Sequence, residues 1–145
     1  MAARLVVLDP DDLVLLLRYD DPPPNGVHWV TPGGGLEPGE DVRAAAAREL
    51  REETGWSDVA VGAELGTGVR VFEHTAGLVR QRETHFAARV SEPRRPLGPH
   101  VAAAHALDRI AGWRWWSAAE LAATRERVFP DGLPALIARS RRADA

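Results

Sequence analysis

Three glutamates, Glu49, Glu52 and Glu53, lie within five residues of one another. The surrounding stretch, residues 41–54, is rich in Ala, Arg, Glu and Leu, which predicts a helix. Residues three and four apart share one face of a helix, so the three carboxylates would point to the same side. Each pair of like charges there costs about 0.2–0.5 kcal/mol, and a divalent cation would offset the repulsion. Carboxylates together with substrate phosphates are the ligands that Mg²⁺ typically takes.

The same pattern has a second interpretation, a solvated surface helix whose glutamates are ion-paired with Arg48 and Arg51. The segment before the helix favours the metal site. Three glycines at positions 33–35 and the Pro38-Gly39 pair place a tight loop directly at the helix N-terminus. Glycine-rich loops let backbone groups approach a ligand closely, so the segment predicts a site for a cation and a phosphate.

The elements that must position this loop and helix are read from apolar runs and turn residues. The predicted strands are residues 4–8, 13–19, 27–31, 59–66, 67–74, 78–90 and 113–116. The first two would form a hairpin around residues 9–12, and residues 33–35 would end the third. Residues 20–26, with three prolines, and residues 91–99 are expected to be loops, with a turn at 76–77.

The rest of the chain is expected to be helical or irregular. Residues 100–110 stay open between a helical turn and an ordered loop. Ser117 and Glu120 match a capping box that would begin a helix, and residues 133–141 predict a final amphipathic helix. Mixed strands with two or three helices favour an α/β sandwich, and nothing divides residues 1–145 into more than one domain.

Composition excludes several classes of protein. The chain has no cysteine, which rules out disulfides, thiolate metal sites and a cysteine nucleophile. Its formal net charge of −3 gives no overall basic field to attract nucleic acid. No apolar run approaches the length of a membrane span, and the N-terminus does not read as a signal peptide. We therefore expect a cytoplasmic protein with neither a nucleic-acid nor a membrane partner.

The segment from Gly34 to Trp56 resembles the Nudix box, G-x5-E-x7-R-E-U-x-E-E-x-G-U with U apolar, at every defined position. The matching residues are Gly34, Glu40, Arg48, Glu49, Leu50, Glu52, Glu53, Gly55 and Trp56. Trp56 is bulkier than the aliphatic residue usual at the last position. The resemblance implies a Nudix-type α/β/α sandwich with a mixed β-sheet between helices.

The resemblance also implies roles for the residues of the box. Glu52 and Glu53 would be the principal Mg²⁺ ligands, with Mn²⁺ as a candidate substitute. Glu49 would be a further ligand or the general base, and the carbonyl of Gly34 would also contact the metal. Arg48 would orient the glutamates through ion pairs. Supporting roles are expected for Glu40, which would fix the loop to the helix, and for Gly39 and Gly55, which would set backbone geometry.

Residues outside the box are candidates for substrate binding. The arginines considered as phosphate binders are Arg18, Arg70, Arg80 and Arg82. Glu83 and His85 would share one face of a strand and reach the metal cluster, or simply be half-exposed strand residues. Trp29 would stack on a base or, as the favoured alternative, pack in the core.

Two residues between the sixth predicted strand and the seventh, His105 and Asp108, are further candidates for the metal site. The loops at residues 20–26 and 91–111 are expected to shape the specificity pocket. The resemblance leaves a homodimer open.

The implied activity is hydrolysis of a diphosphate linkage in a nucleoside diphosphate joined to a moiety X, above all a (d)NTP or a related nucleotide. The residues after the box lack the proline typical of ADP-ribose-cleaving relatives and the tyrosine typical of dinucleoside-polyphosphate relatives. One alternative is a catalytically silent nucleotide-binding module, although the box is intact. Another is a prenyl diphosphate isomerase, which the absence of cysteine disfavours.

Overall fold

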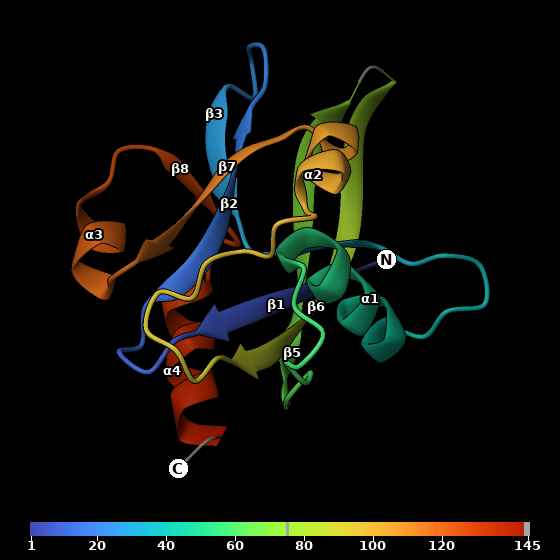
Figure 1. Ribbon diagram of the computed structural model, residues 1–145. Coiled ribbons are helices and arrows are strands. Elements are labelled where there is room, and N and C mark those ends of the chain that lie inside the picture. The colour runs from blue at the N-terminus through green and yellow to red at the C-terminus, as the bar shows by residue number, and fades with distance from the viewer. Residues whose placement is uncertain (75, 144–145) are drawn as a thin grey trace.

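The structure is a computed structural model that describes residues 1–74 and 76–143 (Figure 1). Its strands belong to one mixed sheet with the order β5-β6-β1-β2-β3-β8, to which β4 adds beside β1 and β7 beside β2. The elements are β1 (Ala2–Leu8), β2 (Val14–Asp20), β3 (Val27–Val30), β4 (Gly33–Gly35), α1 (Val42–Thr54), β5 (Glu64–His74), β6 (Gly77–Arg89), α2 (Ala102–Asp108), β7 (Ile110–Trp116), α3 (Ala118–Ala123), β8 (Arg127–Phe129) and α4 (Leu133–Ala143).

Strand β1 is the centre of the sheet. It runs parallel to β6 from the pair Ala2–Glu83 to the pair Leu8–Arg89, and antiparallel to β4 on its other side. Every residue of β1 is buried, which suits its apolar sequence apart from Arg4. The predicted hairpin with β2 exists only at its tip, where Leu8 pairs with Val14. Beyond that pair, β2 turns away to join β3 and β7.

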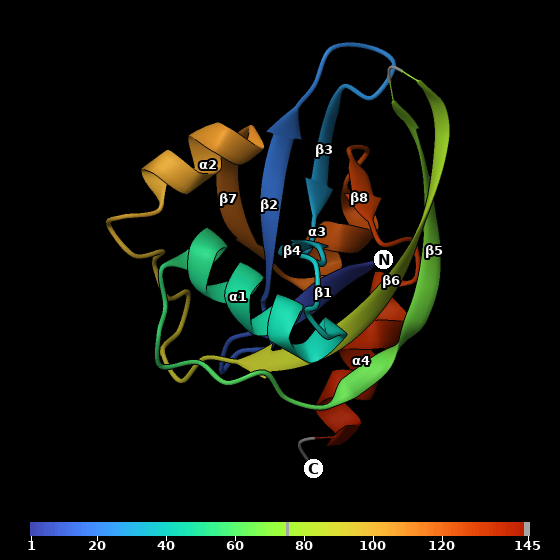
Figure 2. The same cartoon turned by 90° about the vertical axis from the view of Figure 1, so that its right-hand side faces the viewer.

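Helices cover both faces of the sheet, as Figure 2 shows for α1 in front and α4 behind. Ala45, Ala46 and Leu50 of α1 pack in one apolar layer, which also contains Trp115. Leu133 and Leu136 of α4 pack in the other layer, which contains Trp116. Neighbouring strand residues point to opposite faces, which places Trp115 and Trp116 in different layers. The predicted α/β fold with a mixed sheet between helices is confirmed.

Local signals account for the helix boundaries. The side chain of Asp41 accepts a hydrogen bond from the Ala44 amide at 2.8 Å and so begins α1. Gly55 ends it in the left-handed conformation, with φ of 76°. The capping box of Ser117 and Glu120 begins α3 as predicted. None of the helices in the described part of the chain is long and apolar enough to cross a membrane.

The structure differs from expectation, or settles what was left open, in four places. The sequence predicts two strands over residues 59–74, but the structure has one, β5, which starts at Glu64 and carries a register shift between Glu64 and Gly66. Residues 33–35 do not merely end β3 but form β4 against β1. Residues 100–110 contain the helix α2, and the short strand β8 had no signal in the sequence. Both short strands form because a neighbouring strand supplies their hydrogen bonds, and such pairing is not encoded locally.

Candidate active site

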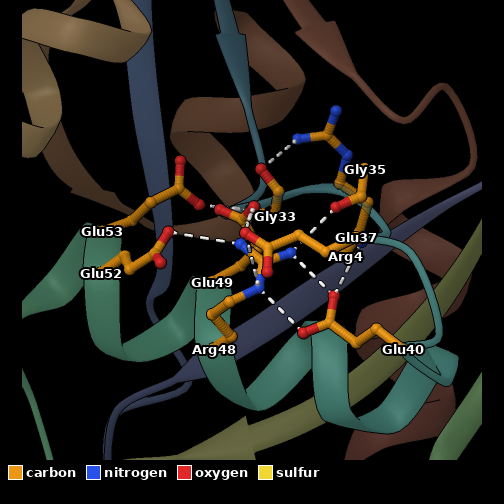
Figure 3. Close-up of polar contacts among 9 residues, drawn as sticks. All are labelled: Arg4, Gly33, Gly35, Glu37, Glu40, Arg48, Glu49, Glu52 and Glu53. Carbon is orange, nitrogen blue, oxygen red and sulfur yellow. Dashed lines mark hydrogen bonds and ion pairs between the residues drawn. The ribbon is translucent and has the colours of Figure 1, made fainter.

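Helix α1 carries the three glutamates (Figure 3), and their side chains differ in burial. Glu53 is 1% exposed and Glu49 is 8% exposed, whereas the side chain of Glu52 is 48% exposed. The i, i+3 and i+4 spacing therefore places one carboxylate inside the protein, one at the edge and one in solvent. A ligand that bound all three would lie where the helix face meets solvent.

Arg48 connects the box loop to the helix. Its guanidinium makes a two-pronged contact with Glu40, from Nε to Oε2 and from Nη2 to Oε1, both at 2.9 Å. It also donates to Glu49 Oε1 at 3.0 Å, to Glu52 Oε2 at 3.3 Å and to the Gly35 carbonyl at 2.9 Å. Hydrogen bonds from Arg48 lower the pKa of Glu40 to about 2. This geometry fits the roles expected for Arg48 and Glu40, in which the pair orients the helix carboxylates.

Glu53 is held from the loop side. One carboxylate oxygen, Oε1, accepts a hydrogen bond from the Gly33 amide at 2.6 Å. Burial, and then the charge of Glu49, raises the pKa of Glu53 to about 8. Burial likewise raises the pKa of Glu49. Glu49 keeps its ion pair with Arg48, whereas Glu53 has no ion pair among the described residues, and a bound cation would supply that missing positive charge.

At Gly33 and Gly34 the glycine loop lies so close to β1 and to Glu49 that an added Cβ would collide. A Cβ on Gly33, whose φ is +149°, would lie 2.1 Å from the Ala3 carbonyl oxygen. A Cβ on Gly34 would lie 2.6 Å from Glu49 Oε1. Glycine at both positions thus lets the loop backbone contact β1 and the carboxylate of Glu49 directly.

The donor set fits a hard divalent cation. It consists of carboxylate oxygens and loop carbonyls without sulfur, which is the chemistry that Mg²⁺ prefers. Within the described residues, no three His, Cys, Asp or Glu side chains already converge on one point. Two of the carboxylates are instead turned to Arg48, which donates to both Glu49 and Glu52 (Figure 3). A cation bound by those carboxylates would have to compete with the Arg48 guanidinium.

A buried ion pair lies behind the glycine loop. Arg4 Nε donates to Glu83 Oε2 at 2.7 Å, and both side chains are less than a tenth exposed. Arg4 Nη1 also donates to the carbonyls of Thr31, at 3.3 Å, and Gly33, at 3.2 Å. A chain of contacts therefore runs from Glu83 through Arg4 and Gly33 to Glu53. Glu83, which the sequence made a candidate for substrate or metal binding, is thus ion-paired with Arg4 in the structure.

The other expected substrate-binding residues lie elsewhere. Arg18 pairs with Asp20 at 2.7 Å on the surface. Trp29 is buried edge-on against Trp116, with 5.0 Å between ring centroids. Arg82 is exposed on β6. None of Arg18, Trp29 and Arg82 lines the large cavity that the described residues form beside the site.

Helix α2 approaches the site through two of the candidate residues. The ring nitrogen Nε2 of buried His105 lies 2.8 Å from the Glu53 carbonyl oxygen and joins α2 to α1. Asp108 is exposed, and its negative charge contributes to the raised pKa values of Glu49 and Glu53. Asp108 is therefore an acidic side chain outside the box that lies within electrostatic range of the carboxylates. His85, by contrast, is buried on β6 beside a smaller cavity of about 320 Å³.

A cavity of about 770 Å³ opens between β2, β3, β5 and β8. Tyr19 and His28 stack within it at 5.4 Å, and Phe129 contributes a further ring. The loop at residues 21–25 forms part of its wall, and its four arginines are Arg4, Arg70, Arg109 and Arg127. Sequence reasoning missed Tyr19, Phe129 and Arg127, because strands distant in the sequence bring them together and no local motif marks them.

The NUDIX domain family model matches residues 1–136. A putative 8-oxo-dGTP diphosphatase 2 of Mycobacterium tuberculosis is 34% identical over 110 residues, which cover 72% of this chain and 77% of that protein. An uncharacterized Nudix hydrolase, YvcI, of Bacillus subtilis is 53% identical over 49 residues, but these cover only 34% of this chain and 28% of the relative. The structure of an Escherichia coli dihydroneopterin triphosphate pyrophosphohydrolase aligns with a TM-score of 0.66 and 19% identity, covering 99% of this chain and 94% of that one.

Proposed function

The chain belongs to the NUDIX family, and on that premise we propose that it hydrolyses a diphosphate linkage in a nucleotide with Mg²⁺ as cofactor. One observation carries the proposal. Glu49, Glu52 and Glu53 lie together on α1 against a glycine loop that leaves no side chain between backbone and carboxylate; Arg48 orients Glu49 and Glu52, and the Gly33 amide holds Glu53.

Nudix hydrolases generally use divalent metal ions, and the oxygen donors here suit one. Glu49, Glu52 and Glu53, together with the carbonyl of Gly34, would hold it. When bound, the cation would neutralise charge on the phosphoryl oxygens and make water more acidic. An oxygen-only donor set suits hard ions, Mg²⁺ with Mn²⁺ as the candidate substitute, and disfavours ions that prefer sulfur ligands.

The reaction needs no covalent enzyme intermediate. A water oxygen attacks one phosphorus of the linkage, a new P–O bond forms, and the P–O bond to the bridging oxygen breaks. Glu49, if it acts as the general base rather than as a further metal ligand, takes the proton from the attacking water. Two phosphorylated products leave, and the enzyme is restored when that proton passes to solvent. Arg48 acts throughout as a positioning residue, because its contacts are to carboxylates and to a loop carbonyl.

We include Asp108 in the proposal as an additional acidic residue that favours binding of the cation. Its charge acts on both Glu49 and Glu53, so it would add to the negative field that binds the cation. In the assay below, Asp108→Asn should raise the Mg²⁺ concentration needed for half-maximal rate. An unchanged Mg²⁺ dependence would remove Asp108 from the site.

We assign the substrate to the nucleoside triphosphates or related nucleotides. The relative with the broadest alignment described above is named a putative 8-oxo-dGTP diphosphatase, and its alignment spans most of both chains. The arginine-lined cavity next to the carboxylates is of a size that takes a nucleotide-sized ligand.

The test is release of phosphate or pyrophosphate, with Mg²⁺, from a panel of canonical and oxidised triphosphates, ADP-ribose, dinucleoside polyphosphates and nucleotide sugars. The double variant Glu52→Gln/Glu53→Gln should lose turnover while keeping its circular dichroism spectrum. Glu64→Gln, an exposed glutamate on β5, is the matched control and should keep full activity. Unchanged turnover in the folded double variant would refute the proposal.

A further inference from the structure

The large cavity has an excess of positive charge that the protein does not neutralise. Arg4 is neutralised by Glu83, but Arg70, Arg109 and Arg127 have no ion pair among the residues that the structure describes. The acidic side chains in the wall are Asp21 and Glu73. Arg109 and Arg127 are exposed, but Arg70 is partly buried, and a buried cation is normally paired, so the unpaired Arg70 beside further arginines indicates an anionic ligand.

Two of these arginines share one aromatic ring. The guanidinium carbons of Arg70 and Arg127 lie 4.8 Å and 5.1 Å from the centroid of Phe129. Arg70 also lies 5.3 Å from the ring of Phe72. Arg70 is on β5 and Arg127 is on β8, the first and last strands in the order of the sheet. The sheet curls so that these two strands lie near each other (Figure 2). Stacking on aromatic rings orients guanidinium groups and leaves their N–H donors free for a planar or tetrahedral anion.

A second observation concerns Arg70 itself. Its Nε is buried and has no hydrogen-bond partner in the described part of the protein. Burial, and then the nearby charge of Arg4, lowers the pKa of the Arg70 guanidinium. A buried donor without an acceptor costs free energy, which an anion in the cavity would recover.

We propose that Arg70 and Arg127, both stacked on Phe129, bind a phosphate of the substrate other than the two that flank the scissile bond. The inference rests on the proposed function and narrows its substrate class to nucleotides with three or more phosphates. Arg70 and Arg127 both line the large cavity, whereas none of the three α1 carboxylates lines it. The two-arginine site is therefore separate from the carboxylates where the bond is cleaved.

Because the carboxylates and the two arginines form separate sites, we expect the protein to prefer a substrate that can occupy both. A diphosphate whose X group is uncharged can occupy the carboxylate site but offers nothing to Arg70 and Arg127. A triphosphate offers its additional phosphate to both. Charge-assisted hydrogen bonds of this kind correspond to about a 10- to 100-fold difference in affinity for each arginine.

The first arm of the test measures binding without catalysis. Inorganic tripolyphosphate is titrated into the metal-free protein in EDTA and followed by calorimetry. Arg70→Gln and Arg127→Gln should each weaken binding about 10-fold or more. Arg125→Gln, the same charge change at an exposed arginine outside the cavity, is the control and should bind as the wild type does. Equal binding by wild type and both cavity variants would overturn the proposal.

The second arm measures turnover with Mg²⁺ on a nucleoside triphosphate and on ADP-ribose, which has no third phosphate. Arg70→Gln and Arg127→Gln should raise KM for the triphosphate about 10-fold or more, with kcat and the KM for ADP-ribose little changed. If tripolyphosphate binding is lost but KM for the triphosphate stays the same, the site serves free polyphosphate and the assignment to substrate is wrong. If tripolyphosphate binds through these arginines but no nucleotide is cleaved, the proposed function fails and the anion site stands.

Discussion

The buried pair of Arg4 and Glu83 should be the most sensitive point of the structure outside the box. The side chains are 9% and 4% exposed, and the two charges are 2.7 Å apart. Removing one partner of such a pair leaves an uncompensated charge in the interior, which typically costs about 3–5 kcal/mol. Glu83→Leu should therefore lower the free energy of unfolding by about 3–5 kcal/mol. In a chain of this length, that corresponds to a fall in Tm of roughly 6–20 °C.

A double-mutant cycle separates the ion pair from the other contacts of Arg4. Arg4→Met should also be destabilising, because it removes the hydrogen bonds to the carbonyls of Thr31 and Gly33 as well as the ion pair. The combined variant Arg4→Met/Glu83→Leu should be more stable than the sum of the two single losses by about 2–3 kcal/mol, since it leaves no charge unpaired.

The assay is urea unfolding followed by circular dichroism, with Glu64→Leu as an exposed control on β5 that should change stability little. The expectation extends to activity, because Gly33 connects Arg4 to Glu53. Glu83→Leu should lower kcat under conditions where the protein remains folded. A loss of less than about 1 kcal/mol in Glu83→Leu, or strict additivity in the cycle, would refute the reasoning that the pair supports the loop.

Two further predictions follow from the box loop. Gly33→Ala should prevent stable folding, since its Cβ would meet the Ala3 carbonyl at 2.1 Å. Gly34→Ala should fold but need more Mg²⁺ for activity, since its Cβ meets only the movable carboxylate of Glu49. Equal Tm values for the two variants would contradict this. Glu40 has a pKa lowered to about 2 by its hydrogen bonds to Arg48, so its contribution to stability is complete above about pH 4.5 and is lost as the pH falls towards 2. The Tm difference between wild type and Glu40→Gln should accordingly be constant above pH 5 and shrink below pH 4, and a difference independent of pH would show that the ion pair does not stabilise the fold.

The helix and loop of the box could be predicted because their signals are local. Asp41 begins α1 with a side-chain hydrogen bond, and Gly55 ends it because a residue without a side chain adopts the left-handed conformation readily. The spacing of Glu49, Glu52 and Glu53 places them on one helix face whatever the rest of the fold does. The family resemblance rested on the same short segment, and the match of the family model to residues 1–136 confirms it.

The rest of the site depends on pairing between distant strands. The register that sets Arg4 beside Glu83 comes from the parallel alignment of β1 with β6, in which Arg4 pairs with His85. Nothing near either residue in the sequence encodes that alignment, so Glu83 could be placed on a strand face but not assigned a partner. Likewise, β4 consists of three glycines, which have low strand propensity and become a strand only because β1 lies beside them.

The cavity was the least predictable part. Tyr19, Arg70 and Phe129 belong to β2, β5 and β8, and β8 itself carried no signal in the sequence. Arg70 was a candidate phosphate binder, but so were Arg18, Arg80 and Arg82. Only the curl of the sheet distinguishes them, because it brings Arg70 to Phe129 and leaves Arg18 paired with Asp20 at the surface.

The tryptophans give each layer of the sandwich its own spectroscopic reporter. Trp56 and Trp115 stack at 6.3 Å on the side of α1, whereas Trp29 and Trp116 meet on the side of α4. Replacing one pair by phenylalanine would leave emission from the other pair together with Trp113, which is 39% exposed. Fluorescence from the two resulting proteins would then reveal whether the layer that carries the carboxylates loosens before the layer beneath it, or whether both melt as one cooperative unit.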